Sequence, residues 1–291
     1  MQIVQELDPL RNAVAELRQG GTLALVPTMG ALHAGHIELV RAARGAADRV
    51  AVSIFVNPRQ FGAGEDLDSY PRQFERDCAL LKAESVDIVW APGVAQMYPE
   101  GYATNISVSG VSEGLCGGTR PGHFDGVATV VCKLFNQVRP DLAFFGEKDW
   151  QQLAVIRRMA RDLDLVRPAA DRIHGVPTKR EADGLAMSSR NAYLTESERA
   201  QAAALPAAMQ AAAAAMADGA PVAQALDDLR SALVAGGFVS VDYAELRDAW
   251  SLEPLDRLTE RPARLLVAAK IGRARLIDNI PVEIAATRLP D

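Results

Sequence analysis

The sequence predicts an α/β protein built on a doubly wound parallel sheet, with a smaller C-terminal α+β domain. Three observations lead to this prediction. Short continuous apolar runs alternate with longer amphipathic segments in the first part of the chain, as expected for parallel strands covered by helices on both faces. Polar and glycine-rich segments follow several of these runs. After about residue 178, helices precede short strands, so we expect two domains, residues 1–178 and 179–291.

Four apolar runs predict buried strands, because each is short and stops at a proline, a glycine or an Asn-Pro pair. They cover residues 22–26, 50–56, 86–90 and 142–145. Helical periodicity predicts helices that alternate with these strands. The predicted helices cover residues 36–47, 71–84, 125–138 and 150–162.

The C-terminal part predicts helices first and strands afterwards. An alanine-rich segment predicts one helix over residues 195–218, which Thr195 and Glu198 begin with the spacing of a capping box. Another helix is expected over residues 221–235, because it starts at a proline and ends at two glycines. Strand-like runs follow at residues 238–246, 264–269 and 274–277.

Composition excludes several classes of protein. The chain has 291 residues, 49% of them hydrophobic and 23% charged, which is typical of a globular domain. Its net charge of −6 argues against binding nucleic acid through overall charge. No apolar run reaches the roughly 18 residues of a membrane helix, and the first ten residues lack a signal-peptide core. The three cysteines form no C-x-x-C pair, which favours reduced thiols in a cytoplasmic protein. From the net charge and the lack of a long apolar run, we expect no nucleic-acid and no membrane partner.

The first candidate site is the His33-Ala34-Gly35-His36 step, which follows a predicted strand. Unpaired amide groups at a helix start attract phosphate, and two imidazoles would add donors there. The alternative is that His33 and His36 are an ordinary cap and a surface histidine. Their place after a strand, and the presence of only four histidines in the chain, favour a phosphate site.

Two further polar segments could bind a nucleotide. In Met187-Ser188-Ser189-Arg190, hydroxyls and a guanidinium suit a phosphate clamp, although the segment could also be a plain turn. In Gly146-Glu147-Lys148-Asp149, Lys148 could reach phosphates and Asp149 could accept bonds from ribose hydroxyls. The alternative for the second segment is a solvated helix start with Asp149 as the N-cap residue.

The remaining candidates concern a small polar substrate. Asn57 and Gln60 follow the second predicted strand and could hydrogen-bond such a substrate, although Asn57 could equally build a turn.

Residues 117–124 are glycine-rich and predict a flap with Arg120 as a phosphate partner, or else a surface loop. The sequence has no G-x-x-x-x-G-K-[ST], G-x-G-x-x-G or G-x-S-x-G motif, which argues against P-loop, dinucleotide-binding and serine-hydrolase classes.

Taken together, residues 27–36, 53–61, 146–149 and 187–190 resemble the pantoate–β-alanine ligase family in order and spacing. The resemblance implies a Rossmann-like domain of the class I nucleotidyltransferase type and a smaller C-terminal domain acting as a lid. It implies ATP-dependent condensation of pantoate with β-alanine through a pantoyl adenylate, with release of AMP and pyrophosphate. It also implies a cytoplasmic homodimer that requires Mg²⁺.

The resemblance also assigns residues, with no metal ligand among them. His36 is the expected catalytic histidine, acting with His33, Lys148 and Arg190. Gln60 and Gln152 are expected to bind pantoate, with Asn57 beside them and Gln60 also near β-alanine. Trp150 stands where the family is expected to have tyrosine, and Lys179 where a smaller apolar residue is usual. The residues expected to bind ATP are Met29, Gly30, Ala31, Leu32, His33, Ala34, Gly35, His36, Gly146, Glu147, Lys148, Asp149, Lys179 (through its backbone), Met187, Ser188, Ser189 and Arg190.

Two other functions remain open at this point. An adenylyltransferase on the same architecture would leave AMP on its product. A regulatory nucleotide-binding protein would bind ATP without releasing pyrophosphate.

Overall fold

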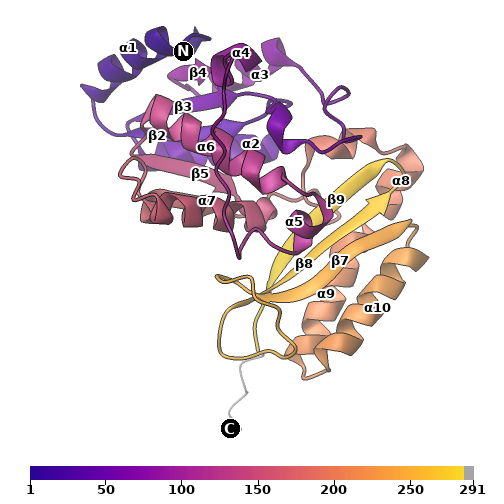
Figure 1. Cartoon of the computed structure of the whole chain (residues 1–291). Coiled ribbons are helices and arrows are strands. Elements are labelled where there is room, and N and C mark those ends of the chain that lie inside the picture. Colours follow the sequence, from indigo (N-terminus) through magenta and orange to yellow (C-terminus); the bar gives the residue numbers. More distant parts are fainter. Residues whose placement is uncertain (285–291) are drawn as a thin grey trace. The chain divides into compact units, whose positions relative to one another are not determined.

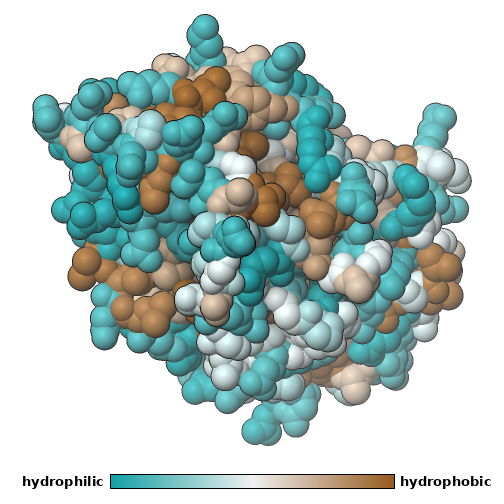
Figure 2. All heavy atoms as spheres, turned by 45° about the horizontal axis from the view of Figure 1, so that its top comes forward, coloured by the Kyte–Doolittle hydropathy of each residue, from teal (hydrophilic) through white to brown (hydrophobic). Residues whose placement is uncertain are grey.

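The computed structural model describes residues 1–284. The chain divides into two compact units, Met1–Lys179 and Arg180–Asp291. In Figure 1 helices cover the sheet of the first unit, and α9 (Ala204–Ala217) and α10 (Val222–Ala235) lie against the sheet of the second. Within residues 1–284 no helix is both long and apolar enough to cross a membrane. Hydrophilic residues cover most of the face drawn in Figure 2.

The first unit contains a six-stranded parallel sheet in the order β1-β4-β3-β2-β5-β6. The doubly wound fold class is therefore confirmed, and the four predicted strands are present. Two strands were not predicted: β1, which is three residues long and exposed at its start, and β6, whose short run contains His174 and Gly175. The strands are β1 (Gln2–Val4), β2 (Leu23–Thr28), β3 (Arg49–Ile54), β4 (Ile88–Trp90), β5 (Leu142–Gly146) and β6 (Ile173–Val176).

Helices connect these strands, and the predicted helix at residues 150–162 has the same bounds in the structure. A first helix, α1, was not predicted; it buries Leu10, Ala13 and Val14. The helices of this unit are α1 (Leu7–Arg18), α2 (Ala34–Ala46), α3 (Phe74–Ala83), α4 (Val94–Met97), α5 (Leu115–Thr119), α6 (His123–Val138) and α7 (Trp150–Asp162), with short 3-10 turns η1 (Pro58–Gln60), η2 (Glu147–Asp149) and η3 (Ala170–Arg172).

Residues 117–124, expected to form a flap or a surface loop, are partly helical. The helix α5 occupies the first part of this segment, and α6 begins at its end. A Cβ atom on Gly117 would collide with the carbonyl oxygen of Ser112. This glycine therefore permits close backbone packing rather than a mobile loop.

Strand β2 lies at the point where the strand order reverses. It pairs with β3 on one side and with β5 on the other. Ligands of doubly wound sheets bind outside the carboxyl ends of the strands at such a point. We therefore expect a ligand-binding site among the loops that follow β2, β3 and β5.

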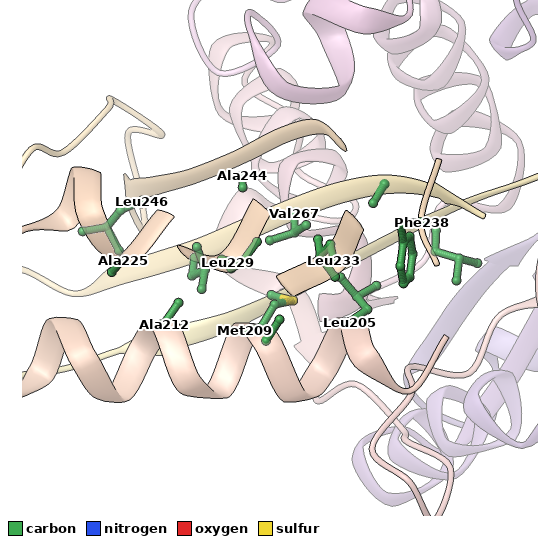
Figure 3. Close-up of a cluster of buried hydrophobic side chains, with 14 of the residues drawn as sticks. Leu205, Met209, Ala212, Ala225, Leu229, Leu233, Phe238, Ala244, Leu246 and Val267 are labelled. Carbon is green, nitrogen blue, oxygen red and sulfur yellow. The ribbon is translucent and has the colours of Figure 1, made fainter. Parts of the chain in front are cut away.

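The second unit packs helices against an antiparallel sheet in the order β7-β8-β9. Side chains of α9 and α10 form its core with residues of the sheet, as Figure 3 shows for Met209, Leu229 and Val267. The bounds are η4 (Ser189–Tyr193), α8 (Glu196–Gln201), α9 (Ala204–Ala217), α10 (Val222–Ala235), β7 (Ser240–Asp248), β8 (Ala263–Ile271) and β9 (Ala274–Val282).

The single helix expected over residues 195–218 is wrong, because the chain forms α8 and α9 instead. The capping box of Thr195 and Glu198 at the start of α8 is confirmed. The break falls just before Pro206, which sits in the first turn of α9. Proline has no N–H group, and its ring clashes with the carbonyl four residues earlier, so a continuous helix cannot pass this position.

Candidate active site

Two histidines close the first turn of α2, at the carboxyl end of β2. His33 is the N-cap residue; its Nδ1 accepts a hydrogen bond from the N–H of Gly35 at 3.2 Å. The Nδ1 of His36 accepts one from the N–H of His33 at 3.3 Å, and the two ring centroids lie 4.1 Å apart. A neutral imidazole that accepts at Nδ1 carries its proton on Nε2. The two rings thus take up amide groups that were expected to be unpaired, and the Nε2 of His36 is left as the nitrogen that can donate to a ligand.

His36 is neutral at pH 7. Burial lowers its pKa to about 3, with further contributions from the nearby His33 and from the positive charge of Lys148. The imidazole of His36 is therefore a hydrogen-bond donor rather than a cation. The positive charge of Lys148 thus acts on this ring, although the two residues come from different loops.

Gly35 allows this arrangement of the rings. A Cβ atom at residue 35 would lie 2.9 Å from Cε1 of His33 and 3.8 Å from the Cβ of Lys179. Lys179 therefore lies beside the turn, and its Nζ is 3.5 Å from a carboxylate oxygen of Glu38. With its side chain directed to Glu38, a contact of Lys179 with ATP would come from its backbone.

The loop between β2 and α2 is held by a buried carboxylate. Gly30 and Ala31 both have positive φ angles, +80° and +51°. Asp77 of α3 accepts hydrogen bonds from the N–H groups of Ala31, at 2.9 Å, and Leu32, at 2.8 Å. These bonds stabilise a backbone shape that costs energy for a residue with a side chain.

Asp77 was not predicted from the sequence. One signal was present: an acidic residue lies directly before Cys78 and four positions before Leu81, on the side of α3 that is buried. A carboxylate on the apolar side of a helix needs hydrogen-bond donors. The sequence does not show which donors those are.

Asn57 follows β3 and is 1% exposed. Its Nδ2 donates to Oε1 of Gln60 at 3.0 Å and to the carbonyl of Gly126 at 3.1 Å. Its Oδ1 accepts from the hydroxyl of Tyr98 at 2.7 Å. Asn57 thus orients Gln60 in this structure, and its direct contact with a substrate stays a prediction.

Gln60 links two of the three loops. Its Nε2 donates to the thioether sulfur of Met29 at 3.0 Å. A thioether is a weak acceptor, so a carboxylate or hydroxyl of a ligand would bind this amide better. The backbone of Gln60 is also held, because its carbonyl accepts from Nδ1 of His123 at 2.7 Å.

Arg120, an expected phosphate partner, is paired within the protein. Its guanidinium donates to both carboxylate oxygens of Glu65, at 2.7 and 2.6 Å. It also lies 3.0 Å from Nε2 of His123, and the pKa of His123 is lowered to about 4, chiefly by burial and then by Arg120. Arg120 and His123 therefore form a network around the carbonyl of Gln60.

The loop after β5 sends its side chains in different directions. The charge of Lys148 acts on His36, and its Nζ is 3.9 Å from a carboxylate oxygen of Asp149. Asp149 precedes α7 but makes no side-chain cap hydrogen bond, so it does not act as the capping residue. Glu147 lies beside β6, where a Cβ atom on Gly175 would be 2.9 Å from its Cγ. The contact expected between Glu147 and ATP stays a prediction.

Two adjacent glutamines in α7 differ in their surroundings. Gln151 is buried; its Oε1 accepts from the N–H of Cys116 at 3.0 Å, and its Nε2 donates to the carbonyl of Val111 at 3.2 Å. The Gln152 side chain is half-buried and makes no hydrogen bond to any of residues 1–284. The structure leaves the Gln152 amide available to a ligand and gives Gln151 a structural role.

The remaining expected ATP residues belong to the second unit. Ser188 is the N-cap residue of η4, and its Oγ accepts from the N–H of Arg190 at 3.2 Å. Met187, Ser189 and Arg190 are half-buried. The individual roles of all these residues stay predictions.

Comparisons with known proteins agree on one family. The model of the family described as pantoate-beta-alanine ligase matches residues 2–281. The chain belongs to this family. It is 68% identical over 283 residues to a pantothenate synthetase of Novosphingobium aromaticivorans, with 97% of this chain and 99% of the relative covered. It is 60% identical over 283 residues to that of Sphingopyxis alaskensis, with 97% of this chain and 100% of the relative covered.

Solved structures of ligases from this family share the fold. Pantothenate synthetase from Thermus thermophilus matches with a TM-score of 0.90 and 47% identity, covering 97% of this chain and 99% of that one. The pantoate-beta-alanine ligase from Francisella tularensis, complexed with beta-gamma ATP and beta-alanine, matches with a TM-score of 0.81 and 32% identity. That match covers 96% of this chain and 97% of the other. The resemblance drawn from the sequence motifs is thus confirmed, and the chain is a ligase of this family.

Proposed function

We propose that this chain condenses pantoate with β-alanine at the expense of ATP, through a pantoyl-adenylate intermediate, and releases AMP and pyrophosphate. The observation that supports this proposal best lies in the first unit. At the point where the strand order reverses, the rings of His33 and His36 lie side by side, and the positive charge of Lys148 acts on the His36 ring. The Gln60 amide is linked to Met29 of the same loop. Phosphate-binding and carboxylate-binding groups therefore come from neighbouring loops.

The first step joins pantoate to the nucleotide. A carboxylate oxygen of pantoate attacks the α-phosphorus of ATP, a new O–P bond forms, and the bond to the pyrophosphate oxygen breaks. The carboxylate is already ionised at pH 7, so this step needs no base. It needs two anions to be aligned and the charge on the leaving group to be neutralised.

The residues near β2 suit that requirement. Neutral His36 would donate a hydrogen bond from Nε2 to a phosphate oxygen. Lys148 would supply the positive charge. Because His36 is neutral, it would donate a hydrogen bond to the phosphate and would not transfer a proton in this step.

Pantoate would be held by uncharged amides. Gln60 would exchange its weak bond to the Met29 sulfur for a carboxylate or hydroxyl oxygen. Gln152 would contribute the second amide. Neutral donors orient a carboxylate without the full positive charge that would weaken it as a nucleophile.

The second step forms the amide bond. The β-alanine amine, after losing a proton, attacks the activated carbonyl carbon, and the bond from that carbon to the AMP oxygen breaks. Met187, Ser188, Ser189 and Arg190 would bind ATP from the second unit. We assign ATP and pantoate binding to residues 1–178 and the role of a lid, which excludes water, to residues 179–291.

Magnesium, the oligomeric state and the compartment belong to the same proposal. Residues 1–284 contain no group of three or more His, Cys, Asp or Glu side chains that could hold a metal ion. Mg²⁺ commonly binds through substrate phosphates and retained waters rather than in an all-protein cage, so we propose that it enters with ATP. We further propose a homodimer in the cytoplasm.

A two-stage assay tests the proposal. ATP and pantoate alone should give one pyrophosphate per active site, and adding β-alanine should then release AMP and sustain turnover. Lys148→Met should abolish the first stage, whereas Lys82→Met, which changes an exposed lysine of α3, should not. An adenylyltransferase would release pyrophosphate but no AMP after β-alanine is added, and a nucleotide-binding protein without turnover would release no pyrophosphate.

A further inference from the structure

Arg199 makes a forked contact with two carboxylates outside the residues assigned above. Its guanidinium donates to Oε2 of Glu181 at 2.5 Å and to both oxygens of Asp183, at 2.6 and 3.2 Å. Arg199 lies in α8, and its side chain is 29% exposed. Such bidentate, charge-assisted bonds fix geometry as well as adding energy. The contact raises the pKa of Arg199 and lowers that of Asp183, so both stay charged at pH 7.

The two carboxylates belong to a tight turn. The N–H of Gly184 donates to the carbonyl of Glu181 at 2.9 Å, and the N–H of Leu185 donates to Oδ1 of Asp183 at 3.2 Å. Gly184 has a φ of +88°, which suits glycine. Arg199 therefore holds the turn that leads directly into Met187–Arg190.

Asn191, which directly follows the segment Met187–Arg190, is bonded to this turn. Its Nδ2 donates to Oε1 of Glu181 at 2.9 Å and to the carbonyl of Ala186 at 3.1 Å. Its backbone N–H donates to the carbonyl of Ser188 at 3.0 Å. The residues on both sides of the segment are thus joined through one carboxylate, Glu181, whose other oxygen binds Arg199.

We propose that Arg199 is a positioning residue for the segment from Met187 to Arg190, acting through Glu181 and Asn191. This inference rests on the proposed function, in which that segment binds ATP. The Glu181 carboxylate is the shared element: one of its oxygens receives the charge-assisted bond from α8, and the other orients the amide of Asn191. Without Arg199, Glu181 and Asp183 would repel each other and the turn would lose its fixed shape.

The test compares ATP affinity among full-length variants. Arg199→Ala should weaken binding of a non-hydrolysable ATP analogue roughly tenfold, the size expected for losing a bond to a charged group. The KM for ATP should rise by a similar factor, while the KM for pantoate stays within about twofold. Arg199→Lys retains the charge but not the fork, so it should restore only part of the affinity.

The connection through Glu181 can be tested separately. Glu181→Gln keeps an oxygen that Asn191 can bind, whereas Glu181→Ala removes it, so the alanine variant should lose more ATP affinity. Arg199→Ala and Asn191→Ala should be non-additive, because both break one network. Additive effects of these two substitutions would overturn the connection.

Arg230→Ala is the matched control. Arg230 lies in α10 of the same unit, pairs with Asp227 at 3.0 Å and donates to the carbonyl of Ala244 at 2.8 Å. Its loss should lower thermal stability without changing the KM for ATP. If Arg199→Ala behaves like Arg230→Ala while Arg190→Ala weakens ATP binding, the positioning role is wrong. If Arg190→Ala also leaves ATP binding unchanged, the assignment of the segment to ATP is wrong instead.

Discussion

His33 and His36 close one helical turn with their side chains: each Nδ1 accepts a backbone N–H from that turn, and the ring centroids lie 4.1 Å apart. This is a capping box in which histidines take the places usually held by Ser or Thr and by Glu or Gln. The capping bonds fix the neutral tautomer of His36 and so determine which nitrogen can meet a ligand. The two side chains that cap the helix are thus the same ones that we propose bind the ligand.

Gly35→Ala should displace the His33 ring, because the new Cβ would lie 2.9 Å from it. We expect pyrophosphate release to fall on the order of 10²-fold, as a small misplacement of a reacting group can cause. Gly45→Ala is the control, since nothing lies within 4 Å of its Cβ position in the same helix. It should leave activity unchanged and raise stability by about 0.5–1 kcal/mol. Equal activity of both variants would contradict the role of Gly35.

The buried neutral His36 should make stability depend on pH. Its pKa is about 3 in the folded protein and near 6.5 when unfolded, so below pH 6.5 the unfolded chain binds the extra proton. Stability is then complete above about pH 6.5 and falls as the pH drops toward 3. His36→Gln keeps a capping side chain and should reduce the loss of unfolding free energy between pH 7.5 and pH 5 by about 1–2 kcal/mol, measured by urea unfolding.

Lys148→Met tests whether the Lys148 charge contributes to the low pKa of His36. Removing the ammonium group should raise the pKa of His36, because its positive charge disfavours the imidazolium. The pKa can be followed by NMR of labelled histidine. An unchanged pKa of His36 would mean that the Lys148 charge does not reach the His36 ring. Lys148 could then not act on a phosphate group bound to that ring.

Asp77→Asn should loosen the loop before α2. The asparagine amide can accept only one of the two N–H groups of Ala31 and Leu32, and an unmet buried donor costs about 1–3 kcal/mol. We expect a higher KM for ATP together with lower stability. Glu75→Gln removes the same charge from the first turn of α3, but Glu75 is exposed, so its ATP kinetics should match those of the unmodified chain. Unchanged ATP kinetics of Asp77→Asn would show that the loop keeps its shape without the carboxylate.

Gln152→Ala and Gln151→Ala should separate substrate binding from folding. The Gln152 side chain has no hydrogen bond within residues 1–284, so its loss should raise the KM for pantoate more than tenfold, raise that for ATP much less, and leave the melting temperature unchanged. Gln151 holds Cys116 and Val111, so its loss should cost about 1–3 kcal/mol of stability. Equal rises of both KM values in Gln152→Ala would remove its assigned role.

Local features of the fold could be predicted because their signal lies in neighbouring residues. The run at residues 142–145 is apolar and stops at a glycine, and the capping box of Thr195 and Glu198 spans four residues. Strand β6 escaped prediction because His174 and Gly175 interrupt its apolar character. The break before Pro206 was missed because alanines on both sides of it favour helix.

The contacts that shape the candidate site lie far apart along the chain. Asp77 meets Ala31 after 46 positions, and Asn57 meets Gly126 after 69. A Cβ atom on Gly126 would overlap the backbone of Arg59, so α6 approaches the Gln60 turn through a glycine. None of these pairs has a local sequence signal, since each depends on the packing of a helix against a distant loop.

The sequence alone determined the family, the alternation of strands and helices, and the residue types that could bind phosphate and a small acid, because these are properties of short segments in a fixed order. Only the tertiary structure decided the order β1-β4-β3-β2-β5-β6, the neutral state of His36, and which polar residues serve the scaffold. The physical reason is that burial, charge proximity and hydrogen-bond partners arise when distant segments pack together.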